Sequence, residues 1–389
     1  MKWKLFSTAF VLSAMLSLVS NVDARTRGSR YRDAQNNKVE QTECGVGKGP
    51  GYGKEIHEMT MGYSAPARIN CEGGWDIFLE GSFIYWFVGQ DQMDLASTIE
   101  PLPEVGPRPH HFGMVRQNQK YKPGFKVALG GNFCHDNWTG KMEYTRIHGT
   151  TLTTATVPPS QNPDQIEPDE GLYVNEGWGH NINRQSSYLR TKWKVKQDTI
   201  DTELGRAYYS GRMFTIHPFY GTRMGWMKQK INFFAIPQNP NFETQEFLSR
   251  SKMKSWFVGP RAGVDAKFIL DWGFRFTGSA AASLLYQRQK VRASLYDAFQ
   301  VNPNWGTVKE KYRSVTPNAE VGAGFGWGSY LMDNSWHLDI LAAYEFHYWW
   351  NQNRIRETLT KNEWVGPGEP VAPGDLFYHG LTLTFRLDF

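Results

Sequence analysis

The sequence contains no long hydrophobic run after its first 24 residues. The run that it does contain, from Leu5 to Val19, follows two lysines and precedes the small-residue motif VDA at 22–24. These are the three regions of a secretory signal peptide, and a single run of this length is too short to predict a membrane-spanning helix. We therefore expect residues 1–24 to be a signal peptide and the mature chain to begin near Arg25.

Cysteine is also scarce, with three in 389 residues: Cys44, Cys71 and Cys134. This number is too small for a disulfide scaffold, and the spacing is too wide for a zinc site. In the oxidising compartment to which a signal peptide leads, one pair of these cysteines can form a disulfide. The sequence does not select among the three pairings, and unpaired thiols are the alternative. It indicates no metal site and no cofactor.

A strong excess of charge is absent as well, because 43 basic and 38 acidic residues leave a formal net charge of +5. This balance does not point to a nucleic-acid partner. The mean hydropathy of −0.53 is that of a soluble protein, yet aromatic residues make up 15% of the chain, a large share for a soluble domain. A transmembrane β-barrel combines these two features, because its strands alternate between lipid-facing and lumen-facing side chains.

The last ten residues, GLTLTFRLDF, alternate strictly between apolar and polar side chains. Their apolar members share one face, which is the pattern of a β-strand with one apolar side. Nine further segments alternate in the same way. The ten predicted strands are 75–87, 121–133, 138–144, 188–196, 214–226, 256–270, 272–286, 315–327, 336–348 and 380–389.

Aromatic residues mark both ends of the apolar face in six of these strands, and the two ends lie twelve residues apart. Twelve residues of a strand tilted by about 45° rise roughly 28 Å, close to the ~25 Å apolar band between the aromatic girdles of an outer-membrane barrel. A soluble β-sandwich, the alternative fold, has strands of about five or six residues and no reason to repeat this distance. The six pairs are Trp75 and Phe87, Tyr121 and Phe133, Phe214 and Trp226, Trp256 and Phe268, Trp336 and Tyr348, and Phe377 and Phe389.

The connections between these strands alternate between short and long, with both termini on the short-turn side. Tight periplasmic turns and long outer loops are typical of outer-membrane barrels. The sequence therefore predicts an all-β fold: an antiparallel transmembrane outer-membrane β-barrel of about ten strands, within a range of 8–14, over residues 73–389. Residues 25–72 are polar and glycine-rich, and we expect them to form a flexible periplasmic segment. Long polar connections are predicted at 90–120, 149–187, 237–254, 290–310 and 350–376.

The terminal strand also suggests how the barrel closes and assembles. Phe389 is expected on the lipid face at the periplasmic rim, where the last strand meets the first. The alternation of Phe385, Leu387 and Phe389 resembles the terminal signal that barrel-assembly machinery reads, so this machinery is an expected partner. Outer-membrane lipid is the other expected partner. Homo-oligomers and disulfide cross-links to other envelope proteins are compatible with the sequence.

Three stretches resemble a known family. PGFKVALGGNFCHDNWTGKMEYTRIHG at 123–149, DTELGRAYYSGRMFTIHPFYGTRMGW at 201–226 and the terminal GLTLTFRLDF are similar to the pore-forming major-outer-membrane-protein-like (MOMP-like) family of intracellular bacteria. The resemblance extends over most of residues 73–389, and its motifs are structural rather than catalytic. It implies the bacterial outer membrane and the role of a general porin that passes small hydrophilic solutes. The alternative is a non-conducting barrel with a structural or a host- or surface-binding role, because ten strands leave a narrow lumen.

Charged side chains opposite the apolar faces are the candidates for lining the pore. Arg190, Lys192, Lys194 and Lys196 form a ladder on one predicted strand. In the lumen this ladder would be a positive wall that weakly favours anions, and neutralisation by acidic residues of other strands is the alternative. The remaining candidates are Glu80, Glu143, Arg261, Asp265, Lys267, Glu320, Asp339 and Glu345.

A catalytic constellation is not evident. Barrel proteases and phospholipases of the outer membrane need a nucleophile or an activated water beside a histidine and an acid near the outer rim. His135 and Asp136 lie at a predicted periplasmic turn, which is the wrong end. His110 and His111 lie in a long loop without a suitably spaced acidic partner. We therefore expect that the protein is not an enzyme.

Overall fold

The computed structural model describes residues 63–67, 69–71, 73–101, 110–133, 137–156, 171–174, 178, 185–237, 247–297, 306–360 and 371–389. The predicted signal peptide and most of the predicted segment 25–72 lie outside these residues. In the described part of the chain, no helix is long and apolar enough to cross a membrane.

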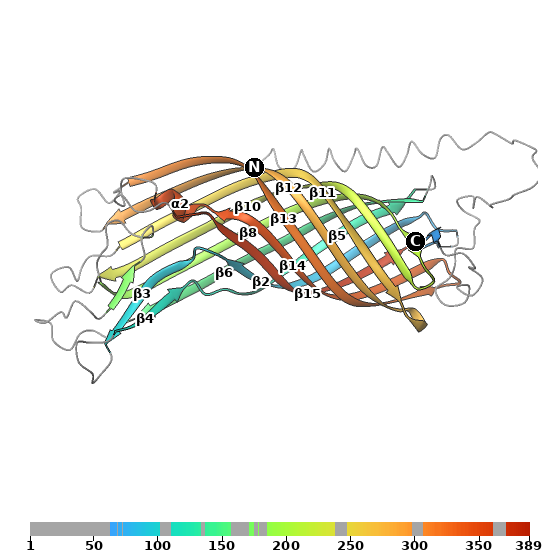
Figure 1. The fold of residues 1–389 in the computed structure, drawn as a ribbon, viewed down its shortest axis with the longest axis horizontal. Helices are drawn as coiled ribbons and strands as arrows, with labels where there is room; N and C mark the ends of the chain where they lie inside the picture. Colours follow the sequence, from blue (N-terminus) through green and yellow to red (C-terminus); the bar gives the residue numbers. More distant parts are fainter. Residues whose placement is uncertain are drawn as a thin grey trace, which may run out of the picture. The chain divides into compact units, whose positions relative to one another are not determined.

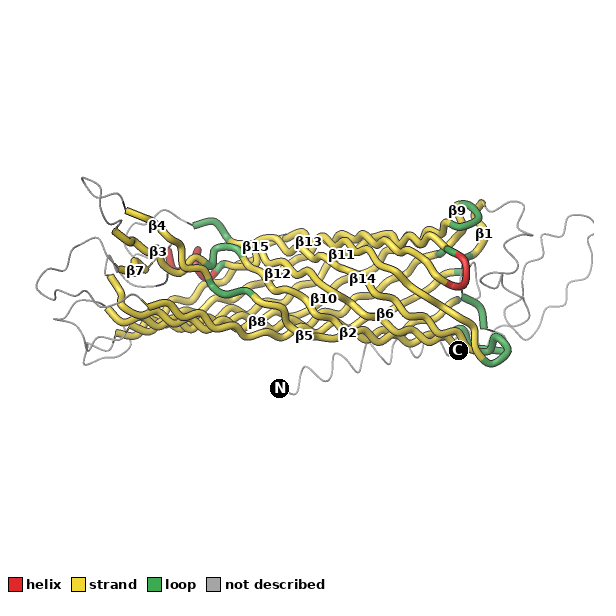
Figure 2. Tube along the Cα trace, turned by 90° about the horizontal axis from the view of Figure 1, so that it is seen from below, coloured by secondary structure: helices red, strands yellow, loops and turns green. Residues whose placement is uncertain are grey.

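Ten antiparallel strands close into a barrel, and the last of them, β15, pairs with the first, β2 (Figures 1 and 2). This confirms the predicted fold and the predicted number of barrel strands. In their order around the barrel the strands are β2 (Ile77–Gln90), β5 (Lys120–Asn132), β6 (Trp138–Thr156), β8 (Gln185–Arg206), β10 (Phe214–Pro237), β11 (Phe247–Ile269), β12 (Phe274–Asp297), β13 (Gly306–Leu331), β14 (Trp336–Asn353) and β15 (Gly374–Asp388).

Five neighbouring strands, β8 and β10 to β13, are longer than the sequence pattern predicts, with 22 to 26 residues each. Their pairing continues far past the outer aromatic girdle, for example from Trp226 opposite Trp256 to Phe234 opposite Leu248. Parts of the predicted loops 237–254 and 290–310 are therefore strand. The prediction was wrong there because the lipid-facing aromatic pattern ends at the membrane boundary, whereas the hydrogen-bonded ladder does not.

Five short strands lie outside the barrel wall. In the long connections these are β3 (Asp94–Pro101), β4 (His110–Arg116) and β7 (Gly171–Val174), and at the short-turn end they are β1 (Tyr63–Pro66) and β9 (Tyr208–Ser210). Strand β1 belongs to the segment that was predicted to be flexible. It pairs with the edge strand β9, whose backbone groups would otherwise lack a partner on that side.

Aromatic side chains on the outward face form the two predicted girdles. At the outer boundary Trp226 lies directly opposite Trp256, whose ring is 5.7 Å from that of Tyr286. At the periplasmic boundary Phe214 lies opposite Phe268. Between the two boundaries the outward positions are mostly apolar and exposed, as a lipid-facing band requires.

The C-terminal residue closes the barrel at the periplasmic rim. The Phe389 amide donates to the Ile77 carbonyl at 3.0 Å, and the Ile77 amide donates to the Phe389 carbonyl at 3.2 Å. The Phe389 ring lies 5.5 Å from the Trp336 ring, at the start of a strand in the same rim. The predicted meeting of the last strand with the first is confirmed by these contacts and by the pairing of β15 with β2.

A hydrophobic core fills the outer half of the barrel. It combines inward-facing side chains of the long strands with β3, β7 and the short helix α2 (Ile355–Thr360). Phe257 and Trp349 pack at 5.1 Å between ring centroids, and Trp178 stacks on Phe233 at 6.3 Å. Other members are Trp86, Trp193, Ile355, Leu359 and Tyr378. We refer to this group as the outer apolar layer.

Candidate functional site

A water-accessible cavity of about 300 Å³ occupies the lumen below the outer apolar layer. Inward-facing side chains from all ten barrel strands line it. Seven basic and eight acidic side chains are among them. The basic residues are Lys126, Lys141, Arg223, Arg261, Lys267, Arg275 and Arg386, and the acidic residues are Glu80, Glu143, Asp201, Glu203, Asp265, Glu320, Asp339 and Glu345.

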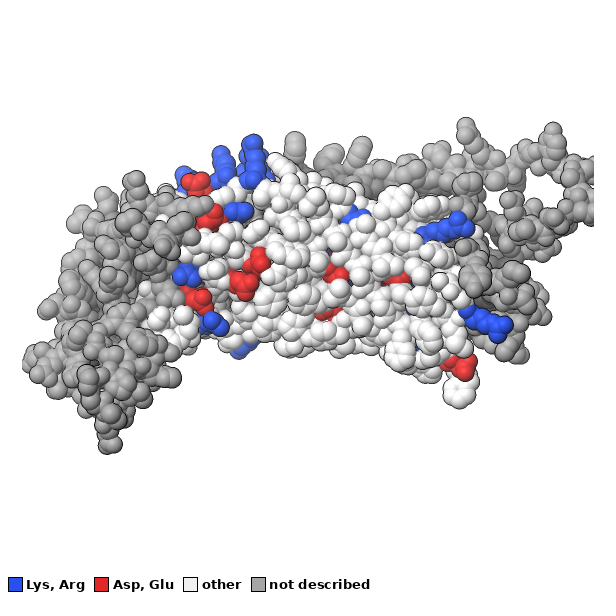
Figure 3. Space-filling model, in the orientation of Figure 1, with Lys and Arg blue, Asp and Glu red and all other residues white. Residues whose placement is uncertain are grey.

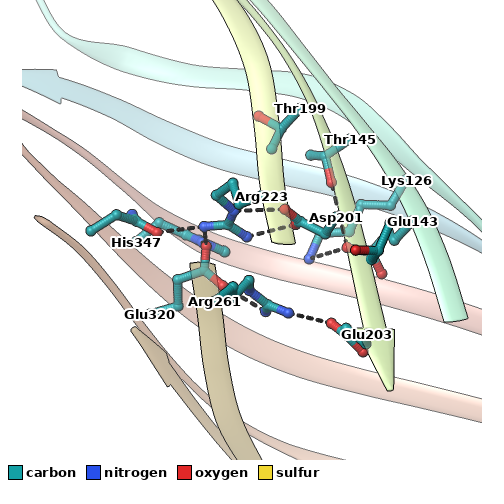
Figure 4. A network of polar contacts seen from close by, with 12 residues as sticks. Lys126, Glu143, Thr145, Thr199, Asp201, Glu203, Arg223, Arg261, Glu320 and His347 are labelled. Atoms are coloured by element: carbon teal, nitrogen blue, oxygen red, sulfur yellow. Dashed lines mark hydrogen bonds and ion pairs between the residues drawn. The ribbon is translucent and has the colours of Figure 1, made fainter. Parts of the chain in front are cut away.

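Arg223 is the centre of the charged network in the middle of the lumen (Figure 4). Its guanidinium holds the Asp201 carboxylate of the neighbouring strand β8 with two hydrogen bonds, of 2.7 and 2.6 Å. It also forms an ion pair with Glu320 on β13, which is not a neighbour of β10 in the sheet. A side chain of one wall therefore reaches across the lumen to another wall.

Arg261 on β11 extends this network. One guanidinium nitrogen donates to Glu320 at 2.9 Å, and another forms an ion pair with Glu203 on β8. Lys141 on β6 reaches the second oxygen of Glu203 at 3.1 Å. Because these charged side chains extend into the lumen from four strands and contact one another there, they narrow the lumen at this level.

A second group of charges joins the first from the opposite wall. Lys126 on β5 donates to Glu345 on β14 at 2.7 Å, although two strands separate β5 from β14 around the barrel. His347 lies 2.9 Å from Glu345 and 3.1 Å from Glu320, and so connects the two groups. The network therefore crosses the lumen in two places and is continuous between them.

The periplasmic end of the cavity carries smaller groups of ion pairs. Arg386 contacts Asp388 on the same strand, β15, at 2.6 Å, and Glu80 on the neighbouring first strand, β2, at 3.2 Å. Arg275 pairs with Asp339, and His217 lies 3.2 Å from Asp265. Most charges in the cavity wall thus have an opposite charge within reach.

The outer apolar layer lies directly above this network. The Arg223 guanidinium is 5.5 Å from the centre of the Trp349 ring, a cation–π contact that joins the network to the layer. Trp193 is 1% exposed and donates its indole N–H to Gln229 at 3.3 Å. The described side chains thus form two successive obstacles along the lumen, one charged and one apolar.

The basic ladder lies on the opposite side of its strand from the one predicted. On β8 the buried, inward side chains are the odd-numbered Leu189, Trp193 and Val195, which belong to the outer apolar layer. Arg190, Lys192, Lys194 and Lys196 therefore point outward, away from the lumen. The prediction failed because this part of β8 lies beyond the membrane boundary, where the apolar face fills the barrel and the charged face meets the surroundings.

The other predicted pore-lining residues are all in the cavity wall: Glu80, Glu143, Arg261, Asp265, Lys267, Glu320, Asp339 and Glu345. Sequence reasoning missed seven charged residues of the cavity wall: Lys126, Lys141, Asp201, Glu203, Arg223, Arg275 and Arg386. The available signal was the alternation itself, because Asp201 and Glu203 share odd numbering with Thr199 and face away from Ile200 and Leu204. The predicted strand ended at residue 196. Beyond this residue the apolar side chains face outward instead of inward, and the acidic side chains of Asp201 and Glu203 face the lumen.

Most of the cysteines and histidines considered in the sequence lie outside the described residues or are described by their backbone alone. Cys71 is a free thiol, whereas Cys44 and Cys134 lie outside the described residues, so the disulfide hypothesis stays a prediction. His135 and Asp136 also lie outside them, and of His110 and His111 the structure describes the backbone in β4. Within the described ranges, no group of three or more His, Cys, Asp or Glu side chains is arranged to hold a metal ion.

A family model described as Legionella pneumophila major outer membrane protein precursor matches residues 70–389. No curated protein matches the chain. Solved structures with a similar fold include the outer membrane protease OmpT from Escherichia coli, with 10% identity, 81% of this chain and 97% of that chain covered, and a TM-score of 0.40. Others are the CymD monoaromatic hydrocarbon channel (8%, 86% and 91%, 0.29) and a Pseudomonas aeruginosa FadL homologue (11%, 80% and 89%, 0.28). Similarities of this size assign neither an activity nor a substrate.

Proposed function

The chain belongs to the Legionella major outer membrane protein family, and we propose that it forms a narrow channel for diffusion of small hydrophilic solutes across the outer membrane. The observation that carries this proposal is the cavity lined by charged side chains from all ten strands. Ionisable groups are costly inside a membrane and usually mark a path for water, ions or solutes. A barrel that only needed a filled interior could use mainly apolar side chains, as the hydrophobic core in the outer half of this one shows.

The charges of the lumen support a pore with little preference between anions and cations. Seven basic and eight acidic side chains nearly cancel, and both signs are distributed around the wall. The preference for anions expected from the sequence depended on the ladder at 190–196, which points outward. We therefore propose selection by size and polarity instead of by charge.

A second candidate function is a non-conducting structural barrel. The outer apolar layer favours it, because buried rings such as Trp193, Phe257 and Trp349 occupy the lumen above the cavity. The two candidate functions differ in whether the side chains of this layer move apart and the ion pairs below it open to leave a continuous passage. In the channel proposal, conduction requires both to move, and the arginine pairs are the narrowest polar passage.

Single-channel recording of the refolded protein in planar bilayers distinguishes the two candidates. The channel proposal expects discrete conductance steps with the unmodified protein, and a reversal potential near zero in a salt gradient. Heat-denatured protein is the control for artefacts of insertion. Silent bilayers from a protein that is folded by its electrophoretic mobility would support the structural barrel, above all if the Trp193→Ala variant, whose outer layer is loosened, were silent too.

A further inference from the structure

Ten basic side chains form two parallel rows on the outward face of β8, β10, β11, β12 and β13. Strand pairing places them in register, each directly opposite the next. The lower row is Lys196, Lys228, Lys254, Lys290 and Lys311, and the upper row is Lys194, Lys230, Lys252, Arg292 and Lys309. We call these ten residues the basic belt. Figure 3 shows Lys and Arg side chains at both ends of the barrel surface, with more of them at one end, whereas the middle of that surface is largely white.

The belt has no acidic counterpart. None of its ten side chains forms an ion pair with a described residue. The one acid that lies between two members along a strand is Glu310, which lies opposite the core residue Val291 and therefore on the other face of β13. The nearest outward acid, Asp198, lies two residues below Lys196. It is engaged by the Tyr144 hydroxyl at 2.9 Å and lies 3.4 Å from His148.

The belt begins immediately above the outer aromatic girdle. Lys228 and Lys254 each lie two residues beyond Trp226 and Trp256, and Lys230 and Lys252 lie four residues beyond them. On tilted strands these steps correspond to roughly 5 and 10 Å above the girdle. The headgroup layer of a bilayer extends about 5–8 Å from the edge of the hydrocarbon core. The lower row therefore lies at the depth of the lipid headgroups, and the upper row lies just outside them, from where its long side chains can extend back to the phosphates.

Like charges that face each other across strands destabilise a sheet. Partial burial and the ammonium groups of Lys230, Lys252 and Lys254 lower the pKa of Lys228, which lies beyond the girdle and so outside the membrane band. The neighbouring Lys254 ammonium, with partial burial, likewise lowers the pKa of Lys252. Part of the lowering of both pKa values comes from cations that lie close together without neutralisation by the protein. Such a surface calls for an external anion.

We propose that the basic belt binds phosphate groups of outer-leaflet lipid headgroups and so surrounds one side of the barrel with tightly held lipid. Rows of cations about 5 Å apart match a ligand that carries several phosphates at one depth, and long lysine side chains can extend to them while their stems cover the strand. The belt covers one side, because on β6 the rows continue with His148 and Thr150 instead of lysine. This inference depends on the membrane location and not on whether the lumen conducts.

The test uses the refolded full-length barrel in a neutral detergent, titrated with diphosphoryl lipid A and with its dephosphorylated form. Binding is followed by the rise in the thermal unfolding midpoint. We expect a rise with the phosphorylated lipid and none with the dephosphorylated lipid. The Lys228→Gln/Lys254→Gln variant should bind about tenfold or more weakly, and adding Lys230→Gln and Lys252→Gln should weaken binding further. The effect should shrink at high salt, since exposed charges are screened within about 10 Å at 0.1 M.

The matched control removes two exposed basic side chains elsewhere, as Lys120→Gln/Arg212→Gln. This variant should bind the phosphorylated lipid like the unmodified protein. Inorganic phosphate at the same phosphate concentration separates a lipid site from a site for free anions. The proposal is overturned if the belt and control variants bind equally, if the dephosphorylated lipid stabilises as well, or if inorganic phosphate alone reproduces the full effect.

Discussion

Arg223 and Asp201 face each other on neighbouring strands, and two nitrogens of the guanidinium donate to the two carboxylate oxygens at 2.7 and 2.6 Å. Both side chains are 4% exposed. The same guanidinium pairs with Glu320 across the lumen, so one arginine holds two walls of the barrel at a fixed distance. This relationship makes Arg223 the residue whose removal most directly tests what the charged network does.

Replacing Arg223 with methionine should lower the free energy of unfolding by about 3–5 kcal/mol, because it leaves buried carboxylates without their partner. It should also widen the polar passage and increase single-channel conductance. The matched control is Lys267→Met, which removes a cation that lines the same cavity but forms no ion pair with a described residue. Equal losses of stability in the two variants, by denaturant unfolding, would show that the pairing itself contributes little.

The outer apolar layer predicts a different response. Trp193→Ala should lower the free energy of unfolding by about 3–5 kcal/mol, since a fully buried indole leaves a large cavity. It should also raise conductance if this layer limits the pore. Trp272→Ala is the control, because Trp272 is 89% exposed at a periplasmic turn. Thermal or urea unfolding of the two refolded variants checks the expected difference, and a similar cost for both would contradict the assignment of the layer as core.

Because the basic ladder at 190–196 points outward, changing its charges should not alter the ion selectivity of the lumen. Changing Lys192, Lys194 and Lys196 to Glu should leave the reversal potential in a salt gradient unchanged, because none of the three faces the lumen. Glu345→Gln, which removes a negative charge from the cavity wall, should move the reversal potential toward anion preference. If the triple variant shifted the potential as much as Glu345→Gln does, the ladder would have to contact the ion path.

Strand β8 shows what sequence reasoning could and could not provide. Alternation correctly identified a strand at this position, and barrel closure and strand number followed from ten such patterns. The sequence did not show which face of the strand points into the lumen, because alternation separates the two faces without saying which one is inside. Within the membrane Ile200 and Leu204 face lipid, whereas beyond it Trp193 and Val195 face the lumen. The outer membrane boundary crosses β8 between residues 196 and 200. No residue of β8 itself indicates this boundary, which is located by the aromatic girdle on neighbouring strands.

The ion pairs across the lumen could not be predicted from the sequence either. Arg223 and Glu320 are 97 residues apart in the chain and lie on strands that do not pair. Their contact depends on the stagger of ten strands and on which inward side chains share a level, and neither follows from the pattern of one strand. What the sequence did identify was the set of charges opposite the lipid face within the band, and those eight candidates all line the cavity.

Cys71 provides a test of local environment at the periplasmic end. Burial, reinforced by the carboxylates of Asp388 and Asp76, raises the pKa of this thiol to about 11. The thiolate is the reactive form, so at pH 8 alkylation should be about 100-fold slower than for a thiol at the ordinary pKa of 9.0, and it should accelerate with pH up to about 11. The rate of iodoacetamide labelling in a Cys44→Ser/Cys134→Ser protein checks this, with the urea-unfolded chain as reference. Equal rates for folded and unfolded protein would contradict it.

Phe389 allows assembly to be separated from stability. Its ring lies against Trp336 at the periplasmic rim, and its backbone is bonded to Ile77 in both directions. A charge at this depth of the lipid face costs only about 0–1 kcal/mol, so Phe389→Asp protein refolded in detergent should be nearly as stable as the unmodified protein. In cells, however, its level in the outer membrane should fall severalfold, because we expect the assembly machinery to read the terminal aromatic residue. Phe389→Tyr keeps the ring and should assemble normally. Normal surface levels of Phe389→Asp would exclude a recognition role, whereas a large loss of stability in the refolded protein would show that the residue acts through packing instead.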